Sequence, residues 1–378
     1  MKYIAFFDLP GFESEKRYAN MAAAQVVTYM IDVFSSVDSV EVISPSRTLH
    51  KKGYFKARTT KISANAQLVL PPTFGANGFI TRFLSRLWIQ LWLFWYLLIH
   101  TKVGEKVVFY HSLSIMTTIK LLTVLKRIKP ILEFREIYSD IDPVSAWLKR
   151  KEHSFYTCAY GYIFPSEALK NLLNIGNKPY VLAPGSYTVY IENKNKFNDG
   201  KIHLVYAGNF RKDKGGAYVA IECAKQLDEQ YVIHILGRDN ENCIKELCDT
   251  IKLVEQRGNA AKIIYEGYKS GQELYDFLAK CDIGLAVQKP GAFNNSSFPS
   301  KILIYLGCGL SVISPNIDAV KLSPVSSLVT LYDSEDISSL TSAIKSGTHT
   351  SDPTQEIRRL DCDLRQQLSR ILSKDETN

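Results

Sequence analysis

The chain has 378 residues, of which 46% are hydrophobic and 22% charged, so it has the composition of a globular protein and enough length for two domains. Its seven cysteines are scattered without a Cys-x-x-Cys pair, which argues against a disulfide framework and against a zinc site of that spacing. The first eight residues turn polar too early for a signal peptide, so a cytoplasmic protein is expected.

The net charge of +8 is unevenly distributed along the chain. Residues 1–185 contain 23 Lys and Arg against 13 Asp and Glu, whereas the remainder contains 23 against 25. The basic first half is therefore expected either to meet an anionic partner or to carry an ordinary solvated basic surface. No nucleic-acid partner is expected.

Strand and helix patterns alternate through the first half of the chain. Strands are expected at 2–8, 40–43, 67–70, 107–110, 131–134, 162–164 and 180–182. Helices are expected at 20–35, 79–100 and 114–127, while the rest of 51–77 shows no clear pattern. Such alternation predicts a parallel sheet with helices on both faces.

The alternation restarts after a segment, 187–201, that is rich in Asn and Lys and is typical of a linker. Further strands are expected at 202–206, 232–237, 262–265, 283–287 and 311–313, with helices at 216–227, 301–307 and 354–373. The predicted fold class is α/β, with two doubly wound Rossmann-like domains that face each other across a cleft. The expected boundaries are 1–186, 202–350, and 351–378 for a C-terminal helix and tail that cross back to the first domain.

The most informative segment is Phe298–Gly309, a polar turn that opens an apolar helix. Pro299 suits the first turn, and Ser300 and Lys301 follow it directly. Helix N-termini carry unpaired N–H groups and partial positive charge, and a lysine adds a point charge, so this segment predicts a phosphate site. The alternative is an ordinary helix cap with a solvated lysine.

Four motifs precede or form this segment in a fixed order. They are Ala207–Gly216 with its Gly and Lys residues, Leu236-Gly237-Arg238, Tyr265-Glu266-Gly267-Tyr268, and Asn294–Lys301. This ordered set resembles the second domain of the GT-B nucleotide-sugar glycosyltransferases, particularly family 4, over about 202–315. Weaker matches occur at Phe164–Ala168 and Ala183–Gly185.

The resemblance implies a donor site in the second domain. Lys214 matches a lysine that contacts the donor diphosphate, Asn209 stands where the family places an arginine, and Arg211 is the candidate substitute. Ser300 and Lys301 match the phosphate-binding helix start. The donor-binding residues implied are Gly208, Asn209, Arg211, Lys214, Gly237, Arg238, Tyr268, Ser297, Ser300 and Lys301.

One departure from the family concerns its Glu-x7-Glu pair, whose second Glu holds the donor ribose. The corresponding positions here are Ser296 and Ile304, and neither is acidic. Ribose and sugar contacts are therefore expected to differ, and retaining stereochemistry does not carry over.

The catalytic base is expected just beyond the strand at 131–134. Glu136 and Asp140 are the candidates, because reactive groups collect at the carboxyl ends of parallel strands. The alternative for Glu136 is a helix cap or an ion pair with Arg135. Asp8 and His111 are weaker candidates at other strand ends. Asp140-Ile141-Asp142 resembles a metal-binding motif of another transferase fold, but no metal and no cofactor is expected.

The helix at 79–99 holds three of the four tryptophans. Arg82, Arg86 and Gln90 make it too polar to span a bilayer, so it either covers the first sheet or lies in a membrane interface. In the second case the acceptor would be a saccharide linked to a polyprenyl diphosphate, and the protein would sit on the inner face of the plasma membrane.

These features together predict a metal-independent, hexosyltransferase-like glycosyltransferase that uses a nucleotide-sugar donor, with UDP as the expected nucleotide. The expected acceptor is a saccharide or a lipid-linked saccharide in surface polysaccharide or glycoconjugate synthesis. A nucleotide-sugar epimerase and an inactive partner protein of the same fold stay open as alternatives. The sequence does not determine the sugar, the linkage, the anomeric outcome or the oligomeric state.

Overall fold

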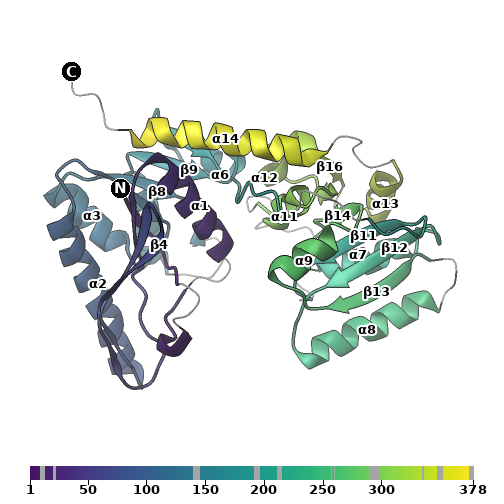
Figure 1. Cartoon of the computed structure of the whole chain (residues 1–378), viewed down its shortest axis with the longest axis horizontal. Helices are drawn as coiled ribbons and strands as arrows, with labels where there is room; N and C mark the ends of the chain where they lie inside the picture. The colour runs from purple at the N-terminus through teal and green to yellow at the C-terminus, as the bar shows by residue number, and fades with distance from the viewer. Residues whose placement is uncertain are drawn as a thin grey trace. The chain divides into compact units, whose positions relative to one another are not determined.

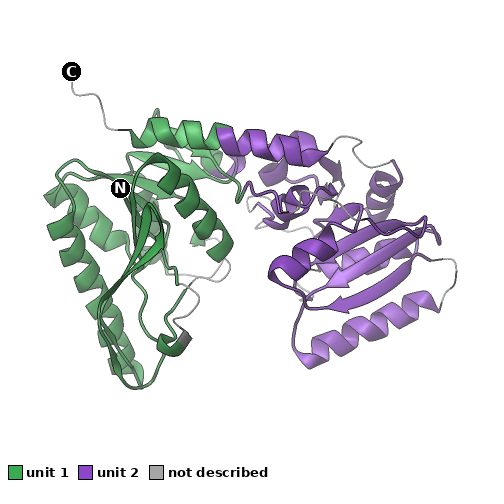
Figure 2. Ribbon diagram, viewed as in Figure 1, with its two compact units in different colours: residues 1–165, 170–186, 363–378 green, residues 166–169, 187–362 purple. Residues whose placement is uncertain are grey.

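The computed structural model describes residues 1–8, 13–19, 23–138, 145–190, 196–210, 215–256, 258, 260–288, 298–333, 336–346 and 352–373. The chain forms two compact units, shown in Figure 2. Unit 1 contains residues 1–165, 170–186 and 363–378, and unit 2 contains 166–169 and 187–362. All seven cysteines are free. Among the described residues, no helix is long and apolar enough to cross a membrane.

Unit 1 is built on an eight-stranded sheet in the order β10-β9-β8-β7-β1-β2-β5-β4. Its strands are β1 (Lys2–Ile4), β2 (Val40–Ile43), β4 (Arg58–Ser63), β5 (Ala66–Leu70), β7 (Lys106–Tyr110), β8 (Lys129–Glu133), β9 (Gly161–Phe164) and β10 (Tyr180–Leu182). All neighbours pair in parallel except the edge strand β4, which is antiparallel to β5. β3 (Tyr54–Phe55) and β6 (Thr73–Phe74) form a separate ribbon.

Helices cover both faces of this sheet, as predicted. They are α1 (Ala24–Val37), α2 (Phe79–His100), α3 (Met116–Leu125), α5 (Ala146–Tyr156) and α6 (Glu167–Leu172), with a 3-10 turn η1 (Glu13–Glu15). Figure 1 shows α2 and α3 on one face and α1 on the other. Apolar side chains of β1, β7 and β8 are fully buried between them, Tyr3 and Phe109 among them.

Unit 2 has a six-stranded, fully parallel sheet in the order β13-β12-β11-β14-β15-β16. The strands are β11 (Ile202–Ala207), β12 (Tyr231–Leu236), β13 (Lys262–Gly267), β14 (Ile283–Leu285), β15 (Ser311–Pro315) and β16 (Val329–Tyr332). The helices are α7 (Gly216–Ala224), α8 (Glu241–Glu255), α9 (Gly271–Leu278), α11 (Lys301–Gly307), α12 (Asp318–Lys321), α13 (Ile337–Lys345) and α14 (Pro353–Leu372), with a 3-10 turn η2 (Ser326–Leu328).

The core of unit 2 lies where α7, α8 and α13 pack on the sheet. Its centre is made by buried side chains such as Ile233 and Ile235 of β12, Ala220 of α7 and Leu247 of α8. These strands read as continuous apolar runs because both faces of a parallel sheet are covered.

The segment 187–201, expected as a linker, packs onto unit 2 wherever it is described. Tyr190 donates its N–H to the carbonyl of Gly307 at 3.0 Å and stacks on Tyr275. Phe197 stacks on His203 and on His234.

The C-terminal helix α14 has residues in both units. Residues 353–362 belong to unit 2, and the helix residues after them belong to unit 1. There Arg365 pairs with Asp32 of α1 at 2.6 Å. The chain thus returns to the first unit at its end.

Candidate functional site

The strand order of unit 2 places a topological switch point at β11 and β14. From β11 the chain winds through β12 to β13, and from its neighbour β14 it winds in the other direction to β15 and β16. Connections that leave two adjacent parallel strands in opposite directions open a crevice beyond their carboxyl ends, where ligands bind in such folds. The residues after Ala207 and after Leu285 therefore border the candidate site.

Two glycines shape the loops at this point. Gly237, just after β12, has φ +154°, and a Cβ atom added there would lie 1.9 Å from the carbonyl oxygen of Gly208. A Cβ atom at Gly208 would in turn lie 3.1 Å from Nζ of Lys301. At Gly237 a side chain is excluded by the backbone of Gly208, and at Gly208 the space is taken by the side chains of Tyr206 and Lys301. Three of the predicted donor-binding residues, Gly208, Gly237 and Lys301, thus lie close together.

The lysine is oriented by an aromatic side chain of β11. Lys301 Nζ lies 4.0 Å from the ring centroid of Tyr206, and its side chain is half-buried. Stacking over an aromatic face stabilises an ammonium group. The ammonium group of Lys301 is therefore held at the switch point by the ring of Tyr206.

Tyr305 ties α11 to the end of β11. Its buried hydroxyl accepts the N–H of Ala207 at 2.8 Å. Its ring lies on Gly284 of β14, where an added Cβ would come within 2.4 Å of it. One side chain thereby fixes the lysine-bearing helix to both strands of the switch point.

The other predicted donor residues are placed as follows. Ser300 is the N-cap of α11, it is exposed, and its hydroxyl makes no cap hydrogen bond. Arg238 lies over the ring of Tyr268 at 4.4 Å. The carbonyl of Asn209 accepts the hydroxyl of Tyr206 at 3.2 Å. Arg211, Lys214 and Ser297, and also Ser296 of the missing Glu pair, lie outside the described residues.

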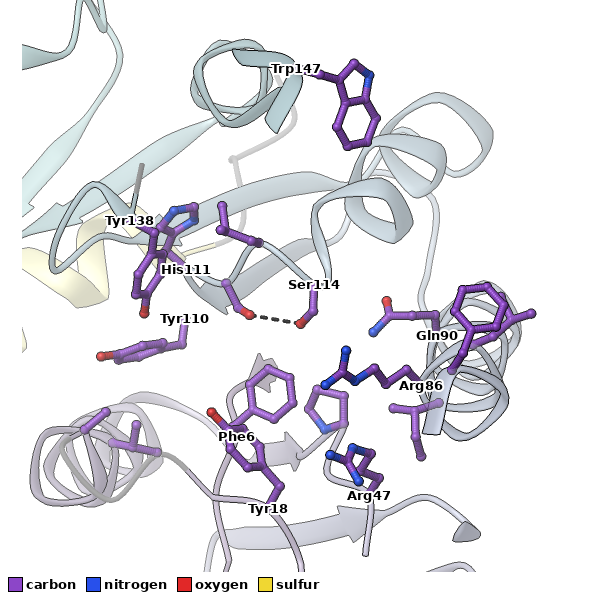
Figure 3. Close-up of a pocket in the computed structure, with 18 residues that line it drawn as sticks. Phe6, Tyr18, Arg47, Arg86, Gln90, Tyr110, His111, Ser114, Tyr138 and Trp147 are labelled. Atoms are coloured by element: carbon purple, nitrogen blue, oxygen red, sulfur yellow. Dashed lines mark hydrogen bonds between the residues drawn. The ribbon is translucent and has the colours of Figure 1, made fainter. Parts of the chain in front are cut away.

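Unit 1 holds a cavity of about 980 Å³ at its own switch point (Figure 3). β1 is flanked by β2 and β7, and the cavity lies beyond their carboxyl ends. Its described lining residues are Phe6, Tyr18, Ala23, Val27, Pro45, Arg47, Phe83, Arg86, Leu87, Ile89, Gln90, Tyr110, His111, Ser112, Leu113, Ser114, Tyr138 and Trp147. They include aromatic side chains, hydroxyls, a histidine and two arginines, and none of them is acidic.

His111 is the one titratable imidazole in this described lining. Its Nε2 lies 2.8 Å from Oε1 of Glu152, and both side chains are buried. Burial lowers the pKa of His111 against the opposing effect of Glu152. Because a carboxylate only accepts, Nε2 carries the proton and Nδ1 keeps its lone pair. Nδ1 is buried without a hydrogen-bond partner among the described residues.

The structure describes one of the two predicted catalytic carboxylates, Glu136, and not the other, Asp140. Glu136 is half-buried and is not among the residues that line the cavity. Asp140 lies outside the described residues. Arg135 pairs with buried Glu133, its Nη2 lying 2.5 Å from Oε1.

Sequence reasoning missed the two cavity arginines. The sequence pattern predicts Arg86 only as a polar interruption of an apolar helix, and no motif marks Arg47 after β2. Both arginines line the cavity at the strand ends. The absence of Asp and Glu between Glu41 and Glu105 is the sequence feature that points to a site for an anion there.

No protein-family model matches this sequence. No curated protein matches it at a significant level either. Solved structures match along nearly the whole chain. A trehalose-6-phosphate protein from E. coli bound with UDP-2-fluoro glucose has a TM-score of 0.66 at 9% identity, covering 98% of both chains.

Two further structures show the same likeness. HepE of Anabaena in complex with UDP and glucose has a TM-score of 0.64 at 13% identity, with 99% of both chains covered. Sucrose-phosphate synthase from Thermosynechococcus elongatus has a TM-score of 0.63 at 11% identity, with 98% of both chains covered. At such identities the likeness defines the fold. The chain has the two-domain α/β fold of GT-B glycosyltransferases, as the sequence predicted.

Proposed function

We propose that this protein is a glycosyltransferase that moves a sugar from a nucleotide-diphosphate donor, a UDP-sugar, to a saccharide or lipid-linked saccharide. The observation that carries the proposal is the placement of the Lys301 ammonium group beside Gly208 and over the ring of Tyr206, at the switch point of unit 2. The solved structures with the same fold support it, since two of them hold UDP or a UDP-sugar analogue.

The donor diphosphate is assigned to the switch point of unit 2. The ammonium group of Lys301 supplies positive charge and hydrogen-bond donors for it. Arg238 and Tyr268 form a stacked pair beside the neighbouring strand end, and we assign them to the nucleotide base. Arg211, Lys214, Ser297 and Ser300 remain part of the proposed phosphate site.

The acceptor is assigned to the cavity of unit 1. Its hydroxyl oxygen attacks the anomeric carbon of the donor sugar, a new carbon–oxygen bond forms, and the nucleoside diphosphate leaves with the electrons of the broken bond. The hydroxyl proton passes to a base. His111 lines the cavity and is one candidate for this base, while Glu136 and Asp140 remain the carboxylate candidates.

The wider proposal is that the transfer is metal-independent and serves surface polysaccharide or glycoconjugate synthesis. It takes place at the cytoplasmic side of the membrane, with peripheral contact through residues 79–99. Hexosyl transfer is the expected reaction.

Thermal-shift measurements against UDP, GDP, dTDP and CMP sugars test the donor assignment, because a bound donor stabilises the fold in proportion to its affinity. UDP and one UDP-sugar should give the largest shift. Lys301→Ala should weaken UDP binding about 10- to 100-fold, the equivalent of one charge-assisted hydrogen bond.

The matched control is Lys262→Ala, which removes an exposed lysine at the start of the edge strand β13. This end of the strand points away from the carboxyl ends that border the candidate site. This variant should bind UDP like the unaltered protein. Equal UDP affinity for Lys301→Ala and Lys262→Ala would refute the phosphate assignment. Failure of every nucleotide to bind would refute the function.

A further inference from the structure

An exposed apolar stripe runs along the whole of α2. The helix buries Ser85, Ile89, Leu93 and Leu97 at four-residue spacing, which is the face it turns to the sheet. Its other face exposes the large apolar side chains Phe79, Ile80, Phe83, Leu84, Leu87, Trp88, Leu91, Trp95 and Ile99. The neighbouring helix α3 adds exposed Leu121, Val124 and Leu125. Contiguous exposed apolar surface of this kind marks an interaction site.

This stripe lies in a part of the chain that has no carboxylate. Between Glu41 and Glu105 the sequence contains no Asp or Glu, although it contains Arg47, Arg82 and Arg86 and several lysines. Burial, together with the charges of Arg86 and Arg82, lowers the pKa of Arg47. The three arginines therefore form a positive cluster with no acidic residue of the same segment to neutralise it.

The cavity of unit 1 joins the stripe to this cluster. Phe83 and Leu87 line the cavity and are also 58% and 43% exposed. Arg47 and Arg86 line it as well, and Figure 3 shows the Arg86 side chain extending from α2 into it. A ligand in this cavity thus meets both exposed apolar side chains and two guanidinium groups.

We infer that Arg47 and Arg86 form a subsite for the phosphate or diphosphate group of a lipid-linked acceptor, whose chain leaves the cavity along α2. The inference rests on the proposed function and specifies its acceptor. Arginine suits this task because its planar fork binds phosphate oxygens in pairs. The apolar stripe and the acid-free segment fit a bilayer interface that contains anionic lipids.

The chemistry distinguishes this acceptor from a free sugar phosphate. A sugar phosphate would use the arginines but would gain nothing from Phe83, Leu87 and the stripe. A neutral saccharide would leave two arginines of the cavity without an anion. Only a ligand that carries both an anionic group and an apolar chain uses both features.

Binding of three probes tests the inference on the full-length protein. Farnesyl diphosphate carries both features, inorganic diphosphate carries the anion alone, and farnesol carries the chain alone. All four tryptophans, Trp88, Trp92, Trp95 and Trp147, lie in unit 1, and Trp147 lines the cavity, so tryptophan fluorescence reports binding there. Farnesyl diphosphate should bind at least about tenfold more tightly than either partial probe.

Matched variants separate the subsite from general charge and general hydrophobicity. Arg86→Gln should weaken farnesyl diphosphate and inorganic diphosphate about tenfold or more, whereas Arg82→Gln, one turn away and outside the cavity lining, should change them less than about threefold. Leu87→Asn should weaken farnesyl diphosphate alone. Leu172→Asn, on α6 and outside both the stripe and the cavity lining, removes an exposed leucine elsewhere in unit 1 and should not weaken it.

Three results would overturn the inference. Inorganic diphosphate binding as tightly as farnesyl diphosphate would indicate a soluble phosphate compound as the occupant. Equal effects of Arg86→Gln and Arg82→Gln would show that only general charge matters. Farnesol binding as tightly as farnesyl diphosphate would remove the anion subsite. These outcomes are independent of UDP binding in unit 2, so the donor assignment can fail or hold separately.

Discussion

The hydroxyl of Tyr305 should stabilise unit 2 and hold Lys301 in place. It accepts the N–H of Ala207 at 2.8 Å, and the side chain is buried beneath the switch point. Replacing it in Tyr305→Phe keeps the ring on Gly284 and removes the acceptor only. The backbone N–H of Ala207 is then left without this partner.

The expected loss follows from that unpaired donor. A buried polar group deprived of its hydrogen bond costs about 1–3 kcal/mol, and Tyr305→Phe should lower the free energy of unfolding of unit 2 by that amount. For a unit of this size the midpoint of thermal unfolding should fall by about 2–4 °C per kcal/mol. Affinity for UDP should also fall by a few-fold, because α11 loses its tie to β11.

Urea-induced unfolding and UDP titration of the same preparation measure both effects. The control is Tyr54→Phe, since Tyr54 is 64% exposed in unit 1 and its hydroxyl is solvated. Tyr54→Phe should change neither quantity. A Tyr305→Phe variant as stable as the unaltered protein would refute the reasoning about the unpaired N–H. Lost stability with unchanged UDP affinity would refute the positioning role.

Two further predictions concern the loops and the buried histidines. Gly237→Ala should lower the free energy of unfolding of unit 2 by more than Gly258→Ala in a urea titration. Both glycines have positive φ, but only at Gly237 would the new Cβ meet backbone, at 1.9 Å. Equal losses of stability in the two variants would contradict the close approach of the backbone at Gly237. Burial lowers the pKa values of His111 and His234, so the unfolded chain binds protons more readily than the folded one. The stability should therefore be full above the unfolded pKa of about 6.5 and decrease as the pH falls below it. Unfolding at pH 7.5, 6.5 and 5.5 measures this, and a free energy that stayed constant or rose on acidification would contradict it.

Several elements were predictable because their patterns are local. The apolar runs of β7, β8, β11 and β12 and the long helix α2 are clear in the sequence. The strand expected at 2–8 is shorter, since only Lys2–Ile4 pairs with neighbours. α8 went unpredicted because its charged face hides the apolar one, of which Leu247, Ile251 and Val254 are buried. β16 and α13 were missed in the same way in a polar part of the chain.

The proximity of three residues of the proposed donor site was predictable. The sequence motifs contain Gly208, Gly237 and Lys301, and the structure places these residues close together. The hydrogen bond between Tyr305 of α11 and Ala207 of β11 was not predicted, because the two residues are 98 positions apart in the sequence. No local pattern encodes such a contact.

By itself, the sequence determined the fold class and the parallel sheets, since hydrophobic periodicity is a property of neighbouring residues. It also predicts phosphate binding at Lys301 from the chemistry of a helix start. Only the tertiary structure decided which side chains share a cavity. It placed Arg47 of one loop beside Arg86 of α2, paired His111 with Glu152, and left Glu136 out of the cavity lining. The physical reason is that strand order sets which chain ends meet at a switch point, and strand order depends on the packing of the whole sheet.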